Sequence, residues 1–217
     1  MKIGIMQPYF IPHIGYFQLV NAVDTFIFYD NVNFIKKGWI NRNFIKNQTL
    51  FTIPLKNQSQ NTLIKDTKIC WDSKLIQKFE KNLQYHYLKS KNFENTYSMI
   101  MSLLNARYET ISELAINSII SFSKYLEIDT NFKAASVENY ISGEGRIKNI
   151  INICKKENAS IFINSAGGQH LYGKQDFKMN NISLKFIHPS QSLSIVDLCF
   201  EKDVIEIKEL LNKYQLK

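Results

Sequence analysis

Residues 3–30 read IGIMQPYFIPHIGYFQLVNAVDTFIFYD, and the order of apolar runs and breaks in this stretch predicts the fold class. Residues 3–6 form a short apolar run that Pro8 stops, which is typical of a buried strand leaving a sheet. Residues 16–22 are amphipathic and indicate a short helix, and the β-branched and aromatic run 25–29 indicates a second strand. Strand, loop, helix and strand at this spacing predict a right-handed βαβ crossover in a parallel sheet, whose carboxyl edge is where ligands bind.

The remaining chain extends this pattern into an α/β fold. Residues 41–45 and 49–55 predict a pair of extended segments, and residues 73–126 predict helices, with a capping box from Thr110 to Glu113. A glycine-rich break at residues 142–145 precedes the remaining predicted elements, a helix at 146–158, strands at 160–164 and 182–187 and a helix at 204–214. We therefore expect one domain over residues 1–217, with a small parallel or mixed sheet, flanking helices and a central helical segment at 73–126.

Composition narrows the class of protein. The net charge of +8 attracts anions, but no helix-turn-helix, zinc-finger or RNA-binding aromatic signature accompanies it, so nucleic-acid binding is not expected. Cys70, Cys154 and Cys199 lie far apart among apolar neighbours, which predicts buried, reduced thiols. No stretch approaches the ~18 uninterrupted apolar residues of a membrane helix. A cytoplasmic protein without membrane insertion is therefore expected.

The densest cluster of polar and charged residues spans residues 30–43 and follows the second predicted strand. Arginine can hold a phosphate or carboxylate through a bidentate fork, lysines supply point charges, and an indole offers a flat face to a sugar or base. The alternative is a solvated hairpin whose charged edge prevents aggregation. We predict catalytic roles for Asp30, Lys36 and Arg42, and substrate-binding roles for Lys37, Trp39, Asn41 and Asn43.

The loop at residues 7–16 is the second candidate site. A glycine at its end permits close approach of a ligand, and the N-terminus of the following helix favours anions. The run from His13 to Tyr16 looks like the His-x-Gly-His loop of adenylyl-transferring enzymes, with Tyr16 in place of the second histidine. That likeness extends the expected fold to a doubly wound sheet of the adenylyltransferase type. We predict nucleotide contacts from His13 and Gly15, and substrate contacts from Gln7, Tyr9 and Tyr16; the alternative is a turn shaped only by prolines and aromatic residues.

A third candidate is the small-residue loop at residues 164–172. After a buried strand, such a loop can present backbone N–H groups to a phosphate or ribose, although an ordinary glycine turn is equally consistent with it. The segment lacks the GxGxxG fingerprint and the P-loop lysine. We predict that Ser165, Gly167 and Gly168 bind a nucleotide, and because no histidine or carboxylate spacing matches metal ligation, no tightly bound metal is expected.

Several of these segments together resemble the WbqC-like protein family. The resemblance rests on residues 6–12, 15–19, 28–32 and 34–43, and it continues through residues 143–154, 165–167 with Tyr172, and 194–198. The family usually has an aromatic residue where His13 stands. The resemblance implies a bacterial protein encoded among enzymes for O-antigen or other surface polysaccharides.

These observations lead to three hypotheses of function. The first is ATP-dependent aminoacyl or acyl transfer, of a glycyl type, which forms an amide on a nucleotide-linked amino sugar. It implies ATP, with or without Mg²⁺, an amino acid or other carboxylate donor, and the nucleotide-linked amino sugar as partners. The alternatives are nucleotidyl transfer to a sugar phosphate, and a non-catalytic binding or assembly protein of glycan synthesis.

Overall fold

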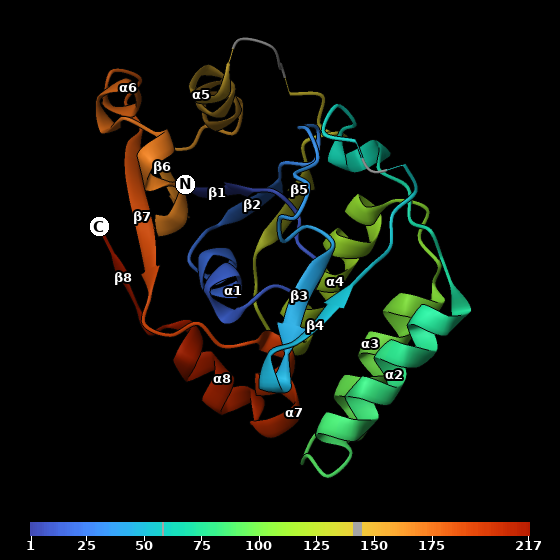
Figure 1. The fold of residues 1–217 in the computed structure, drawn as a ribbon. Helices are drawn as coiled ribbons and strands as arrows, with labels where there is room; N and C mark the ends of the chain where they lie inside the picture. Colours follow the sequence, from blue (N-terminus) through green and yellow to red (C-terminus); the bar gives the residue numbers. More distant parts are fainter. Residues whose placement is uncertain (58, 141–144) are drawn as a thin grey trace.

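The computed structural model describes residues 1–57, 59–140 and 145–217 (Figure 1). Its strands are β1 (Lys2–Met6), β2 (Thr25–Phe28), β3 (Arg42–Ile45), β4 (Thr49–Thr52), β5 (Asn131–Ala134), β6 (Ile161–Ser165), β7 (Ser183–Pro189) and β8 (Tyr214–Leu216). Its α-helices are α1 (Ile14–Asn21), α2 (Ser73–Tyr87), α3 (Phe93–Asn105), α4 (Ile111–Tyr125), α5 (Arg146–Lys156), α6 (Lys174–Lys178), α7 (Ile195–Glu201) and α8 (Val204–Leu211).

The main sheet has the order β5-β2-β1-β6-β7-β8. Its first five strands are parallel, and β8 joins β7 antiparallel. The chain starts at β1, builds outward through β2 and β5, and then returns to the other side of β1 with β6 and β7. The strand order therefore reverses between β1 and β6, which is the switch point of a doubly wound sheet. The predicted α/β fold with a small parallel or mixed sheet is confirmed, and the sheet is mostly parallel.

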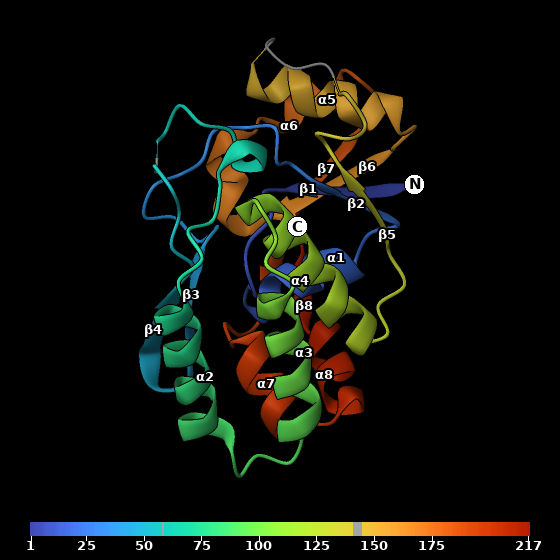
Figure 2. The same ribbon diagram turned by 90° about the vertical axis from the view of Figure 1, so that its right-hand side faces the viewer.

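Helices cover the two faces of this sheet (Figures 1 and 2), and a hydrophobic cluster lies on each face. Alternation along the strands separates them: Phe26 and Phe28 belong to the larger cluster with α1, α3, α4, α7 and α8, whereas Ile27 points into the smaller one with α5 and α6. Gly4 allows close packing of β1, because a Cβ atom there would lie 3.0 Å from the Phe26 ring. Helices thus cover both faces, as a parallel sheet requires.

The segment between β2 and β5 holds the hairpin β3–β4 and the helices α2, α3 and α4. The hairpin is antiparallel, with Arg42 opposite Thr52, and forms a sheet of its own. The helices confirm the predicted helical segment, and the capping box of α4 is present, with Thr110 Oγ1 accepting from Glu113 N and the Glu113 carboxylate accepting from Thr110 N.

Several local predictions need correction. The final helix ends at Leu211, and residues 214–216 form β8 instead of its last turn. Cys154 and Cys199 are buried as predicted, but Cys70 is exposed. On the extended backbone before it, Thr67 and Ile69 are buried and Lys68 is exposed, so alternation turns Cys70 outward.

Two further expectations concern the glycine-rich break and membrane insertion. The predicted break at residues 142–145 falls mostly outside the described residues; Gly145 is its described member, with a φ of 92°. No helix in the described ranges is both long enough and apolar enough to cross a bilayer.

Candidate functional site

A cavity of about 380 Å³ lies where the loop after β1, the strand β3 with its flanking loops and the segment after β7 meet. Four of its lining residues are predicted site residues, namely Tyr9, His13, Trp39 and Asn43. The full lining consists of Tyr9, Pro12, His13, Trp39, Asn43, Phe44, Ile45, Gln48, Ser192, Leu193, Ser194 and Asp197. The structure thus brings together three segments that are far apart in the sequence.

Backbone and amide hydrogen bonds fix the first two of these segments against each other. Phe10 N donates to Ile40 O at 2.9 Å, and the Asn43 side-chain amide donates to Ile11 O. Ile11 has a φ of 47°, in the left-handed region that costs free energy for a β-branched residue. The loop after β1 is therefore held in one shape by its contacts with β3 and the residues before it.

His13 begins α1 and joins it to the third segment. Ile14 N donates to Leu193 O at 2.9 Å, and His13 pairs with Ser194 as an isolated antiparallel bridge. His13 Nδ1 accepts a hydrogen bond from Gly15 N at 3.0 Å, which requires the neutral ring with its proton on Nε2. Desolvation by neighbouring protein atoms lowers the pKa of His13, in agreement with a neutral ring. His13 can therefore offer Nε2–H as a donor at the cavity.

Gly15, which was predicted to let a nucleotide approach, is required by the protein's own packing. A Cβ atom there would lie 2.7 Å from both His13 Cε1 and Pro189 Cγ. Gly15 is buried and does not line the cavity. Gly15 thus helps to hold the His13 ring in place, both by leaving room for it and by donating to Nδ1. A direct contact between Gly15 and a nucleotide stays a prediction.

Tyr16 lies below the loop and supports Tyr9. It is 2% exposed, its hydroxyl donates to Gln7 O at 3.0 Å, and its ring centroid is 5.6 Å from that of Tyr9. Burial raises the pKa of both phenols. Tyr9 is thus the member of this pair that faces the cavity, while Gln7 lies half-buried at the end of β1.

The basic residues of the 36–42 loop have different environments. Arg42 Nε donates to Gly38 O at 2.9 Å, a second guanidinium nitrogen donates to Lys37 O, and the guanidinium carbon lies 5.6 Å from the Trp39 ring centroid. Lys36 and Lys37 are exposed. Arg42 therefore shapes the loop that presents Trp39, which is 45% exposed, to the cavity.

Asp30 and Asn41 are buried away from the cavity lining. The Asp30 carboxylate accepts hydrogen bonds from Ser136 N at 2.9 Å, Ser136 Oγ at 2.7 Å and Ser112 Oγ at 3.0 Å. The Asn41 amide donates to Ile53 O at 2.7 Å. The Asp30 contacts tie the segment after β2 to the segment after β5 and to α4. The Asn41 contact ties the end of the 36–42 loop to the residue after β4. A catalytic role of Asp30 stays a prediction.

Asp197 and Ser194 also line the cavity, and the sequence analysis did not select them as site residues. Tyr87 Oη donates to Asp197 Oδ1 and accepts from Lys46 N at 2.9 Å. Burial raises the pKa of Asp197, against the opposing effects of the Tyr87 hydroxyl and Lys46. One feature of the sequence could have identified Asp197. Residues 194–198 are part of the family resemblance, and in this run Asp197 is the acidic residue among apolar neighbours.

The third predicted loop lies at the switch point, separate from the cavity lining. Register Gly4↔Ile163 makes the ends of β1 and β6 neighbours, so the segments that follow these two strands leave the sheet side by side. A 3-10 helix spans Ala166–Leu171 and contains Gly167 and Gly168. No hydrogen bond between this helix and the 9–13 loop occurs in the described part of the chain.

The same edge carries a cationic residue that the sequence analysis did not select. Arg146 begins α5, and its charge lowers the pKa of Tyr29 and Tyr172, although burial raises both by more. Tyr29 follows β2, and Tyr172 follows the 3-10 helix, 3.7 Å from where a Cβ of Gly168 would lie. One guanidinium and two phenols thus gather at the carboxyl ends of β2 and β6.

Comparison with known proteins places the chain in a family. It is 26% identical over 189 residues to the uncharacterised protein Rv1507c of Mycobacterium tuberculosis, an alignment that covers 81% of this chain and 77% of that protein. No solved structure matches the chain. The model of the WbqC-like protein family matches residues 7–208, a range that includes all three cavity segments. The chain therefore belongs to the WbqC-like protein family, and this membership suggests a role in polysaccharide biosynthesis.

Proposed function

We propose that the protein uses ATP to transfer an aminoacyl or acyl group to a nucleotide-linked amino sugar, forming an amide. The observation that carries this proposal is the path of the loop after β1. It leaves the sheet at the switch point, beside the segment that follows β6, and then passes Tyr9 and His13 in the cavity. One continuous loop thus borders both the switch point, where doubly wound sheets bind nucleotides, and the cavity, which we assign to the acceptor.

At the switch point, the triphosphate of ATP lies beside Arg146, whose guanidinium can form bidentate contacts with phosphate. Ser165 and the following 3-10 helix add hydroxyl and backbone N–H donors. The donor carboxylate attacks the α-phosphorus, pyrophosphate leaves, and an acyl-adenylate remains. Among the described residues no group of three histidine, cysteine, aspartate or glutamate side chains could hold a metal ion. Where Mg²⁺ takes part, the phosphates of ATP supply ligands for it.

In the cavity, the acceptor sugar stacks on Trp39 and contacts Tyr9 and Asn43. Its amine attacks the acyl carbonyl, the amide bond forms, AMP leaves, and the amine loses one proton. Asp197 is the carboxylate that lines the cavity, and it takes this proton as general base. His13 Nε2–H donates to the carbonyl oxygen on which negative charge develops.

The proposal is tested by incubating the protein with ATP, a panel of amino acids and other carboxylates, and dTDP-linked amino sugars. We expect AMP and an acylated sugar in equal amounts by mass spectrometry. Asp197→Asn lowers turnover about a hundredfold, in the range of a lost general base. Glu201→Gln is the matched control, because Glu201 is an exposed carboxylate on the same helix and pairs with Lys46.

Other outcomes distinguish the alternatives. Pyrophosphate release with a nucleotide-linked sugar as product, and no amide, would assign nucleotidyl transfer. The observation that favours a binding or assembly protein is that Asp30 and Arg42 form hydrogen bonds to groups of the protein itself. Absence of both AMP and pyrophosphate across the panel, with retained binding of a nucleotide sugar, would select that function and reject the enzyme.

A further inference from the structure

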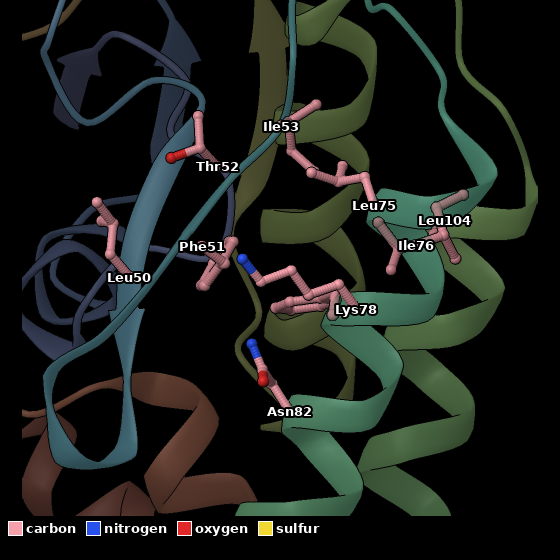
Figure 3. Close-up of a pocket in the computed structure, with 10 residues that line it drawn as sticks. Leu50, Phe51, Thr52, Ile53, Leu75, Ile76, Lys78, Asn82 and Leu104 are labelled. Atoms are coloured by element: carbon pink, nitrogen blue, oxygen red, sulfur yellow. The ribbon is translucent and has the colours of Figure 1, made fainter.

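A second, smaller cavity lies on the other side of the β3–β4 hairpin, between β4 and α2 (Figure 3). It is a groove of about 200 Å³, separate in its lining from the cavity described above. We define it by its lining residues, which are Leu50, Phe51, Thr52, Ile53, Leu75, Ile76, Lys78, Phe79, Asn82 and Leu104. Neither the proposed reaction nor any predicted site residue uses it.

The walls and floor of the groove are apolar. Phe51 and Phe79 meet at its floor with ring centroids 4.7 Å apart. Ile53 and Ile76 add buried aliphatic surface, and Leu50 on its rim is 47% exposed. An engineered apolar cavity of ~150 Å³ binds benzene, so a groove of this size admits an aliphatic chain of roughly six to eight carbons.

Two polar side chains of α2 extend over these walls. Lys78 and Asn82 are one helical turn apart, and Figure 3 shows the ammonium and the amide both reaching from α2 toward β4. No acidic side chain lies within 4.0 Å of the Lys78 ammonium in the described ranges. An apolar groove with an unpaired cation and an amide at its side complements a ligand with an apolar body and an anionic head.

The charge of α2 strengthens this complementarity. Lys74, Lys78 and Lys81 follow one another at spacings of four and three residues, which places them on one side of the helix. Glu80 is the acidic residue of this helix, and its carboxylate accepts a hydrogen bond from Tyr97 Oη. The approach to the groove therefore carries a positive potential that attracts anions.

We propose that the groove binds an aliphatic chain with a single anionic head group, with the chain between Phe51, Ile53 and Leu75 and the head on Lys78 and Asn82. The inference is independent of the proposed reaction, because the two cavities share no lining residue. Carboxylate and phosphate heads have the same chemistry toward a lysine ammonium, which acts as a point charge.

The experiment is calorimetric titration of the protein with octanoate, octyl phosphate and octanol. We expect both anions to bind and octanol to bind at least tenfold more weakly, and the tighter of the two anions identifies the head group. Lys78→Gln weakens anion binding about tenfold, and Asn82→Trp, which fills the groove from a half-buried position, abolishes it. Lys124→Gln is the matched control, since it removes one charge at an exposed position on α4 outside the groove lining.

Circular dichroism verifies that each variant is folded. Equal binding of octanol and octanoate, or equal anion binding by Lys78→Gln and the unmodified protein, would overturn the proposal. Absence of binding by any of the three compounds at millimolar concentration would overturn it as well. None of these outcomes depends on turnover with ATP, so the ligand proposed for the groove and the proposed enzymatic function are tested independently.

Discussion

Two sets of polar side chains near the larger cavity differ in whether they face it. The packed set, Asp30 and Asn41, is buried, and its hydrogen bonds go to hydroxyl and backbone groups of the protein. The lining set, Trp39, Asn43 and Asp197, faces the cavity. Four of these five residues lie within residues 30–43. Residue type marks this segment as unusual, but the role of each residue depends on partners elsewhere in the chain.

A cluster of polar residues in the sequence is not by itself a catalytic site, and Asp30 illustrates this. Asp30 finds its partners at Ser112 and Ser136, which the chain reaches only 82 and 106 residues later. A buried carboxylate without such partners would cost several kcal/mol, so the three donors account for its presence. The packed set should therefore control stability, and the lining set should control binding.

The largest expected effect is that of Asp30→Ala on stability. The substitution leaves the amide of Ser136 and the hydroxyls of Ser112 and Ser136 without their acceptor, so we expect the free energy of unfolding to fall by about 3 kcal/mol or more. Urea denaturation measures this change. Lys37→Ala, at an exposed position in the same segment, should change stability by less than about 0.5 kcal/mol.

A loss below about 1 kcal/mol for Asp30→Ala, together with lost activity, would move Asp30 from the packed set to the catalytic residues. Asp30→Asn sharpens this distinction, because an amide oxygen keeps part of the acceptor capacity. An Asp30→Asn protein that is stable but inactive would likewise identify Asp30 as a catalytic residue.

A smaller effect is expected for Trp39→Ala, and it should appear in binding. Loss of a stacking surface weakens binding of a nucleotide-linked sugar by about tenfold. Stability should change little because Trp39 is 45% exposed. In a Trp71→Phe background Trp39 is the only tryptophan, so quenching of its fluorescence reports ligand in the cavity. Unchanged affinity in Trp39→Ala would place the ligand elsewhere.

The smallest expected effect is the pH-dependent change that Asp197→Asn causes in the free energy of unfolding. Because burial raises the pKa of Asp197, the folded state binds the proton more tightly than the unfolded state does. The stabilisation from this proton is complete below the unfolded-state pKa and is lost as pH rises through the folded-state pKa. An asparagine side chain cannot ionise, so the Asp197→Asn variant should be slightly more stable than the unmodified protein at neutral pH, and this advantage should vanish in acid.

Urea denaturation of both proteins between about pH 3.5 and 7 measures the difference. The asparagine side-chain oxygen can still accept the hydrogen bond from Tyr87. The variant and the unmodified protein therefore differ mainly in the charge at residue 197. A variant that is less stable at pH 7, with the gap closing in acid, would show that the Tyr87 and Lys46 contacts outweigh desolvation.

Much of the fold could be predicted from local patterns. Strands β1, β2, β6 and β7 are apolar or alternating runs, and α4 and α5 show helical spacing. The pattern did not reveal β5, whose sequence Asn131–Ala134 has only two apolar residues and gains its strand from pairing with β2. Tyr214–Leu216 also becomes a strand through its neighbour β7.

Less of the candidate site could be predicted. The residue types of Tyr9, His13, Trp39 and Asn43 were informative, and all four line the cavity. The separation of Asp30 from them depends on the packing of α4 and β5, which no local pattern contains. Asp197 reaches the cavity because the segment after β7 folds back on α1, and that return is a property of the tertiary structure.

The contact between Ile14 and Leu193 has a consequence for the order in which the protein becomes functional. A nascent chain exposes its N-terminal part first, and domains fold as synthesis proceeds. The cavity lacks its third wall until residues 192–197 are available, even when every strand up to β7 has been made. The cavity is therefore completed late, so truncated chains that retain most of the sheet but lack residues 192–197 should not form it.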